Sequence, residues 1–127
     1  MDSKFYVSLE AARLLKEKGY DRKCRAFYQN DEFRPYSFTR NGISMYNKNA
    51  APAYMNQYSA PTKAEAIDWL ESKGIMIDIH WIGFVDARKW NYSIFNCSTY
   101  DRIDTMYIYS TRLEAEEEAI IKALEWL

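Results

Sequence analysis

The chain has 127 residues, a formal net charge of −1 and 48% hydrophobic residues, and 11 tyrosines dominate its aromatic content. This length fits one domain, and the apolar content excludes a chain that is mainly disordered. No stretch approaches the ~18 apolar residues that a membrane span needs, and residues 1–8 lack the apolar core of a secretion signal. We therefore expect a cytoplasmic protein that does not associate with a membrane and whose two cysteines are free thiols.

The beginning of the chain predicts a helix followed by a strand. Ser8 is a residue type that caps helices and Gly19 is the type that ends them, so residues 9–18 are predicted to be helical. Residues 20–28 alternate in polarity, which predicts a strand. One face of this strand is predicted to carry Cys24, Ala26 and Tyr28.

A hairpin is predicted next. Pro35 limits residues 33–39 to an edge strand, because proline has no amide hydrogen to donate to a neighbouring strand. Asn-Gly at positions 41 and 42 is a strong two-residue turn pair. It predicts that residues 36–40 pair with residues 43–46.

The following segment, residues 47–61, is predicted to be an irregular surface loop. It contains two prolines and three asparagines and shows neither a helical nor a strand period. A loop of this length in a small domain is expected to be either functional or mobile.

Residues 62–127 predict a helix, three strands and a helix. Thr62 and Thr111 each begin a Thr-x-x-Glu capping box, which marks the start of a helix, and Gly74 ends the first one. The predicted elements are a helix over 62–73, strands over 75–82, 90–97 and 105–109, and a helix over 111–127.

The predicted fold class is α+β, with an antiparallel sheet and helices packed on one face of it. The chain is interpreted as a single domain over 1–127, in which a helix–strand lobe (1–46) and the loop (47–61) precede an α-β-β-β-α unit (62–127). Core positions in this unit include Ile77 and Leu124.

The sheet of this unit is predicted to have two apolar faces. If Ile75, Ile77, Ile79, Met106 and Ile108 face the helices, the opposite face carries Met76, His80, Ile82, Phe95, Tyr107 and Tyr109. A face in contact with water should be polar instead. We therefore expect the N-terminal lobe or a second subunit, as in a homodimer, to cover it.

Few residues suggest catalysis. His80 is the only histidine, and together with Asp78 or Cys97 it could act as a base in a small enzyme. No pattern marks a nucleophile or an oxyanion hole, and no cysteine or histidine spacing predicts a metal site. We expect no cofactor, and we favour a protein that is not an enzyme.

The tyrosines and arginines of the first half suggest binding instead. Residues 1–60 carry a net charge of +4, and residues 61–127 a net charge of −5. Aromatic and basic residues together can bind single-stranded nucleic acid, anchor a protein partner, or pack in a small satellite core. The candidate interaction surface comprises Arg34, Tyr36, Arg40, Tyr46, Tyr54, Tyr58, His80, Tyr107 and Tyr109.

The sequence shows three resemblances, of which the last covers nearly the whole chain. The order α-β-β-β-α over 62–127 resembles double-stranded RNA-binding domains, but Arg112 is followed by glutamates where those domains place phosphate-binding lysines. Residues 110–115 and the acidic helix after them look like the C-terminal helix of HicB-like antitoxins. Residues 6–19, 60–70 and 109–124 resemble a family of small uncharacterised proteins from gut Bacteroidetes and their phages or mobile elements.

The last resemblance implies a bacterial cytosol and no site residues. We therefore expect a non-catalytic protein-interaction module of phage or mobile-element type, with an unidentified protein or a second copy as its partner. The alternatives are single-stranded nucleic-acid binding by the basic N-terminal lobe, and the small enzyme built on His80.

Overall fold

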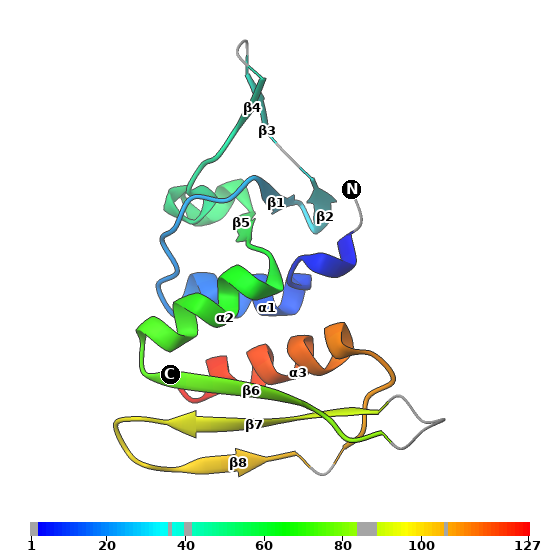
Figure 1. Ribbon diagram of the computed structural model, residues 1–127. Coiled ribbons are helices and arrows are strands. Elements are labelled where there is room, and N and C mark those ends of the chain that lie inside the picture. The colour runs from blue at the N-terminus through cyan, green and yellow to red at the C-terminus, as the bar shows by residue number, and fades with distance from the viewer. Residues whose placement is uncertain (1–2, 36, 40–41, 84–88, 106) are drawn as a thin grey trace. The chain divides into compact units, whose positions relative to one another are not determined.

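The fold was analysed in a computed structural model that describes residues 3–35, 37–39, 42–83, 89–105 and 107–127. Within these residues it has the predicted α+β class, with three α-helices and small antiparallel sheets (Figure 1). The chain divides into two compact units, Met1–Thr62 and Lys63–Leu127. None of the helices in the described residues combines the length and apolar content needed to cross a bilayer.

The first unit opens with a 3-10 turn over Ser3–Phe5 and the helix α1 over Leu9–Glu17. The predicted cap is confirmed, because the Ser8 hydroxyl accepts a hydrogen bond from the Ala11 amide at 3.2 Å. Gly19 follows the helix with a φ of +92°, a conformation that favours glycine. The helix buries Ala11, Ala12 and Leu15.

The sheet of the first unit has the order β2-β1-β5, formed by Glu32–Arg34, Ala26–Gln29 and Gln57–Ala60. The predicted strand over 20–28 is too long, because β1 begins only at Ala26 and Cys24 forms an isolated bridge with Tyr46. Cys24, Ala26 and Tyr28, which were predicted to share one face, are all buried. Asn30 and Asp31 connect β1 to β2 with φ values of +50° and +68°. Two consecutive positive φ angles define the tight turn that joins twisted antiparallel strands, and asparagine and aspartate tolerate them.

The predicted hairpin pairing is also confirmed, with a shift at the turn. Strand β3 (Ser37–Thr39) pairs antiparallel with β4 (Gly42–Ser44). Gly42 lies within β4, opposite Thr39, and not in the connecting turn. Tyr36 and Arg40, two of the predicted interaction residues, lie outside the described residues, as does Asn41.

The prediction of an irregular loop over 47–61 is wrong in its second half. The segment forms 3-10 turns over Lys48–Ala50 and Ala53–Met55 and then strand β5, which pairs with β1 along its whole length. Asn49 fixes the segment, because its side chain donates to the Tyr20 carbonyl (2.9 Å) and accepts from the Ser59 amide (2.8 Å). The prolines and asparagines of this segment form an ordered connection that leads into the short strand β5.

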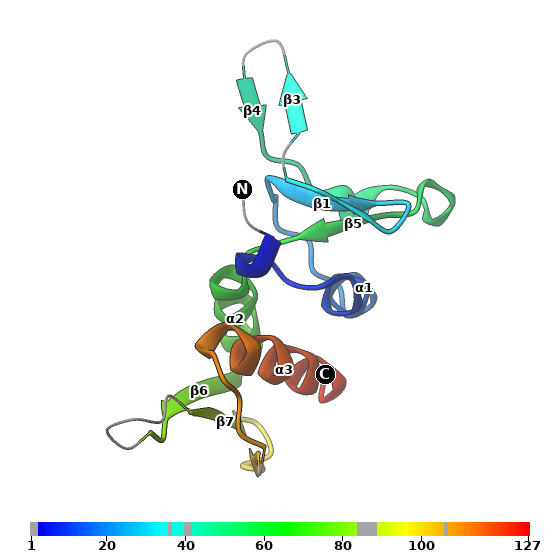
Figure 2. The ribbon, with the colours of Figure 1, turned by 90° about the vertical axis from the view of Figure 1, so that its right-hand side faces the viewer.

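The second unit places two helices on one side of a three-stranded sheet (Figure 2). Helix α2 covers Lys63–Ser72, and Gly74 follows it at a φ of +84°. Helix α3 covers Arg112–Glu125, and the Thr111 hydroxyl caps it by accepting from the Glu114 amide at 3.1 Å. The core between helices and sheet includes the fully buried Leu70, Ile94, Ile120 and Leu124.

The sheet has the order β6-β7-β8, with β6 over Ile75–Trp81, β7 over Trp90–Asn96 and β8 over Arg102–Asp104. The first two strands match the prediction. The predicted third strand over 105–109 is wrong, because the chain turns back earlier. The Asn96 carboxamide oxygen accepts from the amides of Ser98 and Thr99, and Tyr100 adopts a φ of +62°, so pairing resumes at Arg102.

This shorter connection changes which residues occupy the sheet. Tyr109 forms only an isolated bridge with Trp90, and Ile108 is 57% exposed where the prediction placed it against the helices. Met106 lies outside the described residues. The third strand presents Arg102 and Asp104 on the side of the sheet away from the helices, where apolar residues were predicted.

Candidate functional site

The side of the β6-β7-β8 sheet that points away from α2 and α3 carries a polar centre. Cross-strand register places Asp78 opposite Ser93, and Ser93 opposite Asp104. His80 lies opposite Asn91 in the neighbouring pair. We call this surface the outer face, made of Met76, Asp78, His80, Asn91, Ser93, Phe95, Arg102 and Asp104.

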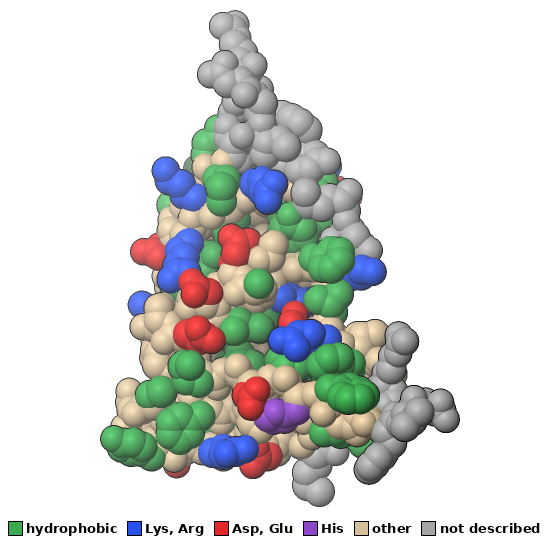
Figure 3. Space-filling view, in the orientation of Figure 1, with side chains coloured by type: hydrophobic (Ala, Val, Ile, Leu, Met, Phe, Trp, Pro, Cys, Tyr) green, Lys and Arg blue, Asp and Glu red, His purple; other side chains and the backbone are tan. Residues whose placement is uncertain are grey.

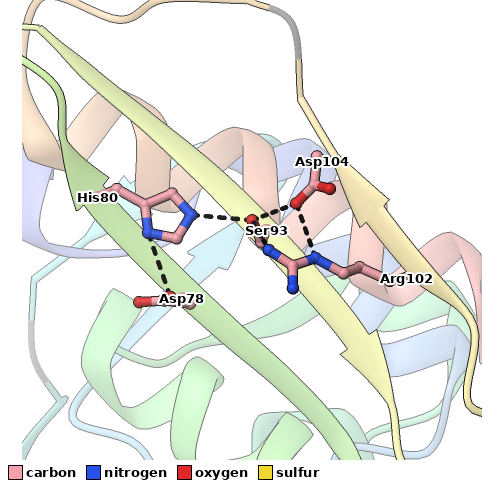
Figure 4. Close-up of polar contacts among 5 residues, drawn as sticks. All are labelled: Asp78, His80, Ser93, Arg102 and Asp104. Carbon is pink, nitrogen blue, oxygen red and sulfur yellow. Dashed lines mark hydrogen bonds and ion pairs between the residues drawn. The ribbon is translucent and has the colours of Figure 1, made fainter.

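A chain of hydrogen bonds crosses all three strands of the outer face (Figure 4). His80 Nδ1 lies 3.1 Å from Asp78 Oδ2, and His80 Nε2 lies 2.8 Å from Ser93 Oγ. The Ser93 hydroxyl donates to Asp104 Oδ1, which also accepts from Arg102 Nε at 2.9 Å. Every member therefore has a defined partner, and the side chains form one ordered network.

Ser93 connects His80 to Asp104 in this network. An ionised carboxylate only accepts, and a serine hydroxyl has one hydrogen to give. Ser93 gives its hydrogen to Asp104, and its oxygen also lies within hydrogen-bond distance of His80 Nε2 at 2.8 Å and accepts from Arg102 Nη2 at 3.4 Å.

The same bonds stabilise the ionised form of Asp104. The hydrogen bond from Ser93, followed by that from Arg102, lowers the pKa of Asp104 below its ordinary value. A carboxyl whose pKa is lower in the folded state contributes stability above its unfolded pKa of about 4. That contribution is lost as the pH falls through the folded-state pKa.

We expect Asp104→Asn to be less stable than the wild type at about pH 6, with the difference shrinking toward about pH 2. As the pH falls, the Asp104 carboxylate takes up a proton, so its advantage over asparagine is progressively lost. Denaturant unfolding followed by circular dichroism over this pH range measures the difference. A gap that stays constant with pH would show that Asp104 contributes through packing alone.

One end of the outer face is apolar. Met76 lies opposite Phe95, they are 42% and 36% exposed, and the Phe95 ring meets the Tyr100 ring edge-on at a centroid distance of 6.4 Å. A hollow of about 250 Å³ lies beside them. Its lining is formed by Met76, Ile77, Asp78, Ser93, Phe95 and Arg102. In Figure 3 hydrophobic side chains flank the histidine and the charged groups around it.

The outer face therefore differs from the prediction. Its centre is polar, so it does not need a cover along its whole length. Of the second-unit residues predicted to bind a partner, only His80 lies on it. Tyr107 follows β8 and is 76% exposed, whereas Tyr109 stacks on Tyr92 on the helix-facing side at 6.1 Å. Burial is the main cause that raises the pKa of Tyr109.

The predicted pairing of His80 with Asp78 is present, but the pairing with Cys97 is wrong. The Cys97 amide donates to the carbonyl of Gly74, which directly precedes β6 and lies six residues before His80, a separation of about 20 Å along an extended chain. Cys24 is buried and Cys97 is exposed, and both are free thiols as expected. The described residues contain no group of three or more His, Cys, Asp or Glu side chains suited to a metal ion.

Sequence reasoning missed Ser93, Arg102 and Asp104. Carboxylate, imidazole and hydroxyl follow one another here in the order found in serine hydrolases. In those enzymes the serine gives its proton to the histidine, whereas Ser93 gives its proton to Asp104. Ser93 is also only 8% exposed. The arrangement is a satisfied polar network and not an activated nucleophile.

Three of the first-unit residues predicted to bind contact charged groups of their own unit, namely Arg34, Tyr46 and Tyr58. Arg34 pairs with Glu32 at 3.0 Å. Lys48 lies 4.9 Å from the ring centre of Tyr46, and the Tyr58 ring has Lys16 at 5.2 Å and Arg13 at 5.7 Å. These cations occupy ring faces that a nucleic-acid base would stack on. Tyr54 is 86% exposed.

Comparison with known proteins gave no match to a protein-family model, to a curated protein or to a solved structure. The resemblances seen in the sequence therefore stay predictions.

Proposed function

We propose that this protein is a non-catalytic protein-interaction module of phage or mobile-element type that binds a partner through the outer face. The observation that supports this proposal is the juxtaposition of the ordered network with the hollow beside Met76 and Phe95. Binding energy at protein interfaces concentrates in a few apolar anchors surrounded by polar groups. A partner side chain that enters this hollow meets both kinds of group in one place.

The rigidity of the surface also favours binding. The polar side chains project from paired strands and are held by bonds to one another, so little side-chain entropy is lost when a partner docks. The hydrogen bonds that fix Ser93 also remove the proton transfer a hydrolase would need. The site is thus suited to recognition.

The proposal is tested by affinity capture from a lysate of a gut Bacteroidetes species, with and without nuclease. We expect one protein to be captured in constant ratio by the wild type, to survive nuclease, and to be lost with Met76→Lys and with Phe95→Asp. Tyr54→Asp is the matched control, since it places a charge on an exposed aromatic position of the first unit, which is not part of the outer face. Circular dichroism must show that each variant is folded.

Two results would contradict the proposal. Capture that depends on intact nucleic acid would favour the basic residues of the first unit, and binding to oligonucleotides should then weaken steeply with salt. Labelling of Ser93 by a fluorophosphonate probe, lost in Ser93→Ala and His80→Ala, would show that the network activates a nucleophile.

A further inference from the structure

Strand β6 is an edge strand with one unpaired side. It pairs with β7 on one side only, and among the described residues no strand lies along the other. The Cys97 amide donates to the Gly74 carbonyl and the Ile82 amide to the Lys89 carbonyl, so even-numbered residues direct their backbone groups toward β7. Antiparallel ladders alternate, so the intervening residues direct theirs outward. These residues are Ile75, Ile77, Ile79 and Trp81.

The side chains along this edge are incompletely covered. Ile77 and Ile79 point toward the helices but are only half-buried, and Trp81 is 58% exposed. The strand has seven residues and contains no proline, glycine or lysine, the residues that usually protect a free edge. A long, apolar and unprotected edge is a template for pairing with another strand.

We infer that β6 pairs antiparallel with β6 of a second copy, with Ile79 on the two-fold axis. This register sets each Asp78 opposite His80 of the second copy, so that a carboxylate faces an imidazole twice. On the helix-facing side it sets Ile77 opposite Trp81, which joins two incompletely covered apolar groups. On the outer side it also sets Met76 opposite Ile82, which are 42% and 39% exposed.

The three symmetric registers nearest to this one are less favourable. An axis at Asp78 places two carboxylates opposite each other, and an axis at His80 places two imidazoles opposite each other. An axis at Ile77 sets Met76 against the charge of Asp78. A two-fold axis at Ile79 is the register in which both polar and apolar pairs match, and it makes one sheet of six strands from the two copies.

The proposed pairing of β6 is independent of the proposed function, because it depends on the unpaired backbone groups at the edge of the sheet. Size-exclusion chromatography with light scattering from about 1 µM to about 100 µM should show a shift from the 15.1 kDa chain to twice that mass. Trp81→Lys is expected to abolish the shift. Ile79→Pro should do the same, since it removes only an outward-facing amide from β6.

Cysteine crosslinking reports the register. In a Cys97→Ser background, mixed Asp78→Cys and His80→Cys proteins should form a disulfide-linked dimer, because facing residues of this kind lie about 4.5 Å apart between α-carbons. Neither variant alone should crosslink. A crosslink within Asp78→Cys alone would overturn the register.

The remaining outcomes separate the possible occupants of the edge. A chain that stays monomeric at every concentration would overturn self-pairing. A dimer that persists in both Trp81→Lys and folded Ile79→Pro would show that copies associate elsewhere. Loss of partner capture in Phe95→Asp with an unchanged dimer would separate the outer face from the edge.

Discussion

Leu124→Ala is expected to lower the free energy of unfolding by about 2–5 kcal/mol, the usual cost of truncating a fully buried leucine. Leu124 is 0% exposed on α3, which contacts α2, β6 and β7. Its removal leaves a cavity in the one layer that joins the two helices to the sheet. Denaturant unfolding with a far-ultraviolet signal measures the change.

Ile77→Ala is the informative comparison. The sequence pattern places Ile77 in the core as firmly as Leu124, yet in the structure it is half-buried at the sheet edge. Its truncation should cost only about 1–2 kcal/mol, since less apolar area returns to water. Equal losses in the two variants would show that the edge of β6 is covered in solution, as in the proposed pairing with a second copy.

The elements that the sequence predicts well are those with local chemical marks. Ser8 and Thr111 cap their helices as predicted, because a side-chain oxygen and the amide three residues later form a purely local contact. The strict alternation from Ile75 to Trp81 defines β6 in the same way. Helix caps and strand alternation are local in the sequence, so they can be predicted without knowing which strand pairs with which.

The failures involve turns and pairing partners. The turn at Asn30 and Asp31 carries no glycine, and the turn that ends at Tyr100 uses a positive φ in a residue that rarely adopts one. Without this second turn, the sequence pattern predicts the third strand over 105–109, whereas the structure has it over Arg102–Asp104. The predicted sheet therefore carries apolar residues on the outer face where the structure has Arg102 and Asp104. For this reason the polar network is not predicted.

The candidate site depends on this cross-strand register. Asp78 and His80 were found together because they are two residues apart on one strand and share a face. Ser93 and Asp104 join them only through the pairing of β6 with β7 and of β7 with β8. A single sequence does not specify the pairing of strands joined by longer connections, so a network across three strands lies beyond pattern reasoning.

Segment 47–61 of the first unit also differs between sequence and structure. Its sequence predicts an irregular loop, whereas its hydrogen bonds hold it in one conformation. Asn49→Ala removes the acceptor of the Ser59 amide, a group in a residue that is 0% exposed. Leaving a buried amide without a partner costs about 1–3 kcal/mol. We therefore expect a loss of that size in the free energy of unfolding, measured by denaturant titration.

Tyr54→Ala is the control within the same segment. Tyr54 is 86% exposed, so its truncation should change the free energy of unfolding by less than about 0.5 kcal/mol. A large loss for Asn49→Ala with none for Tyr54→Ala would mean that the segment is an integral support of β5. If both variants are as stable as the wild type, water replaces the Asn49 contacts, and the segment is as loosely held as its prolines and asparagines predict.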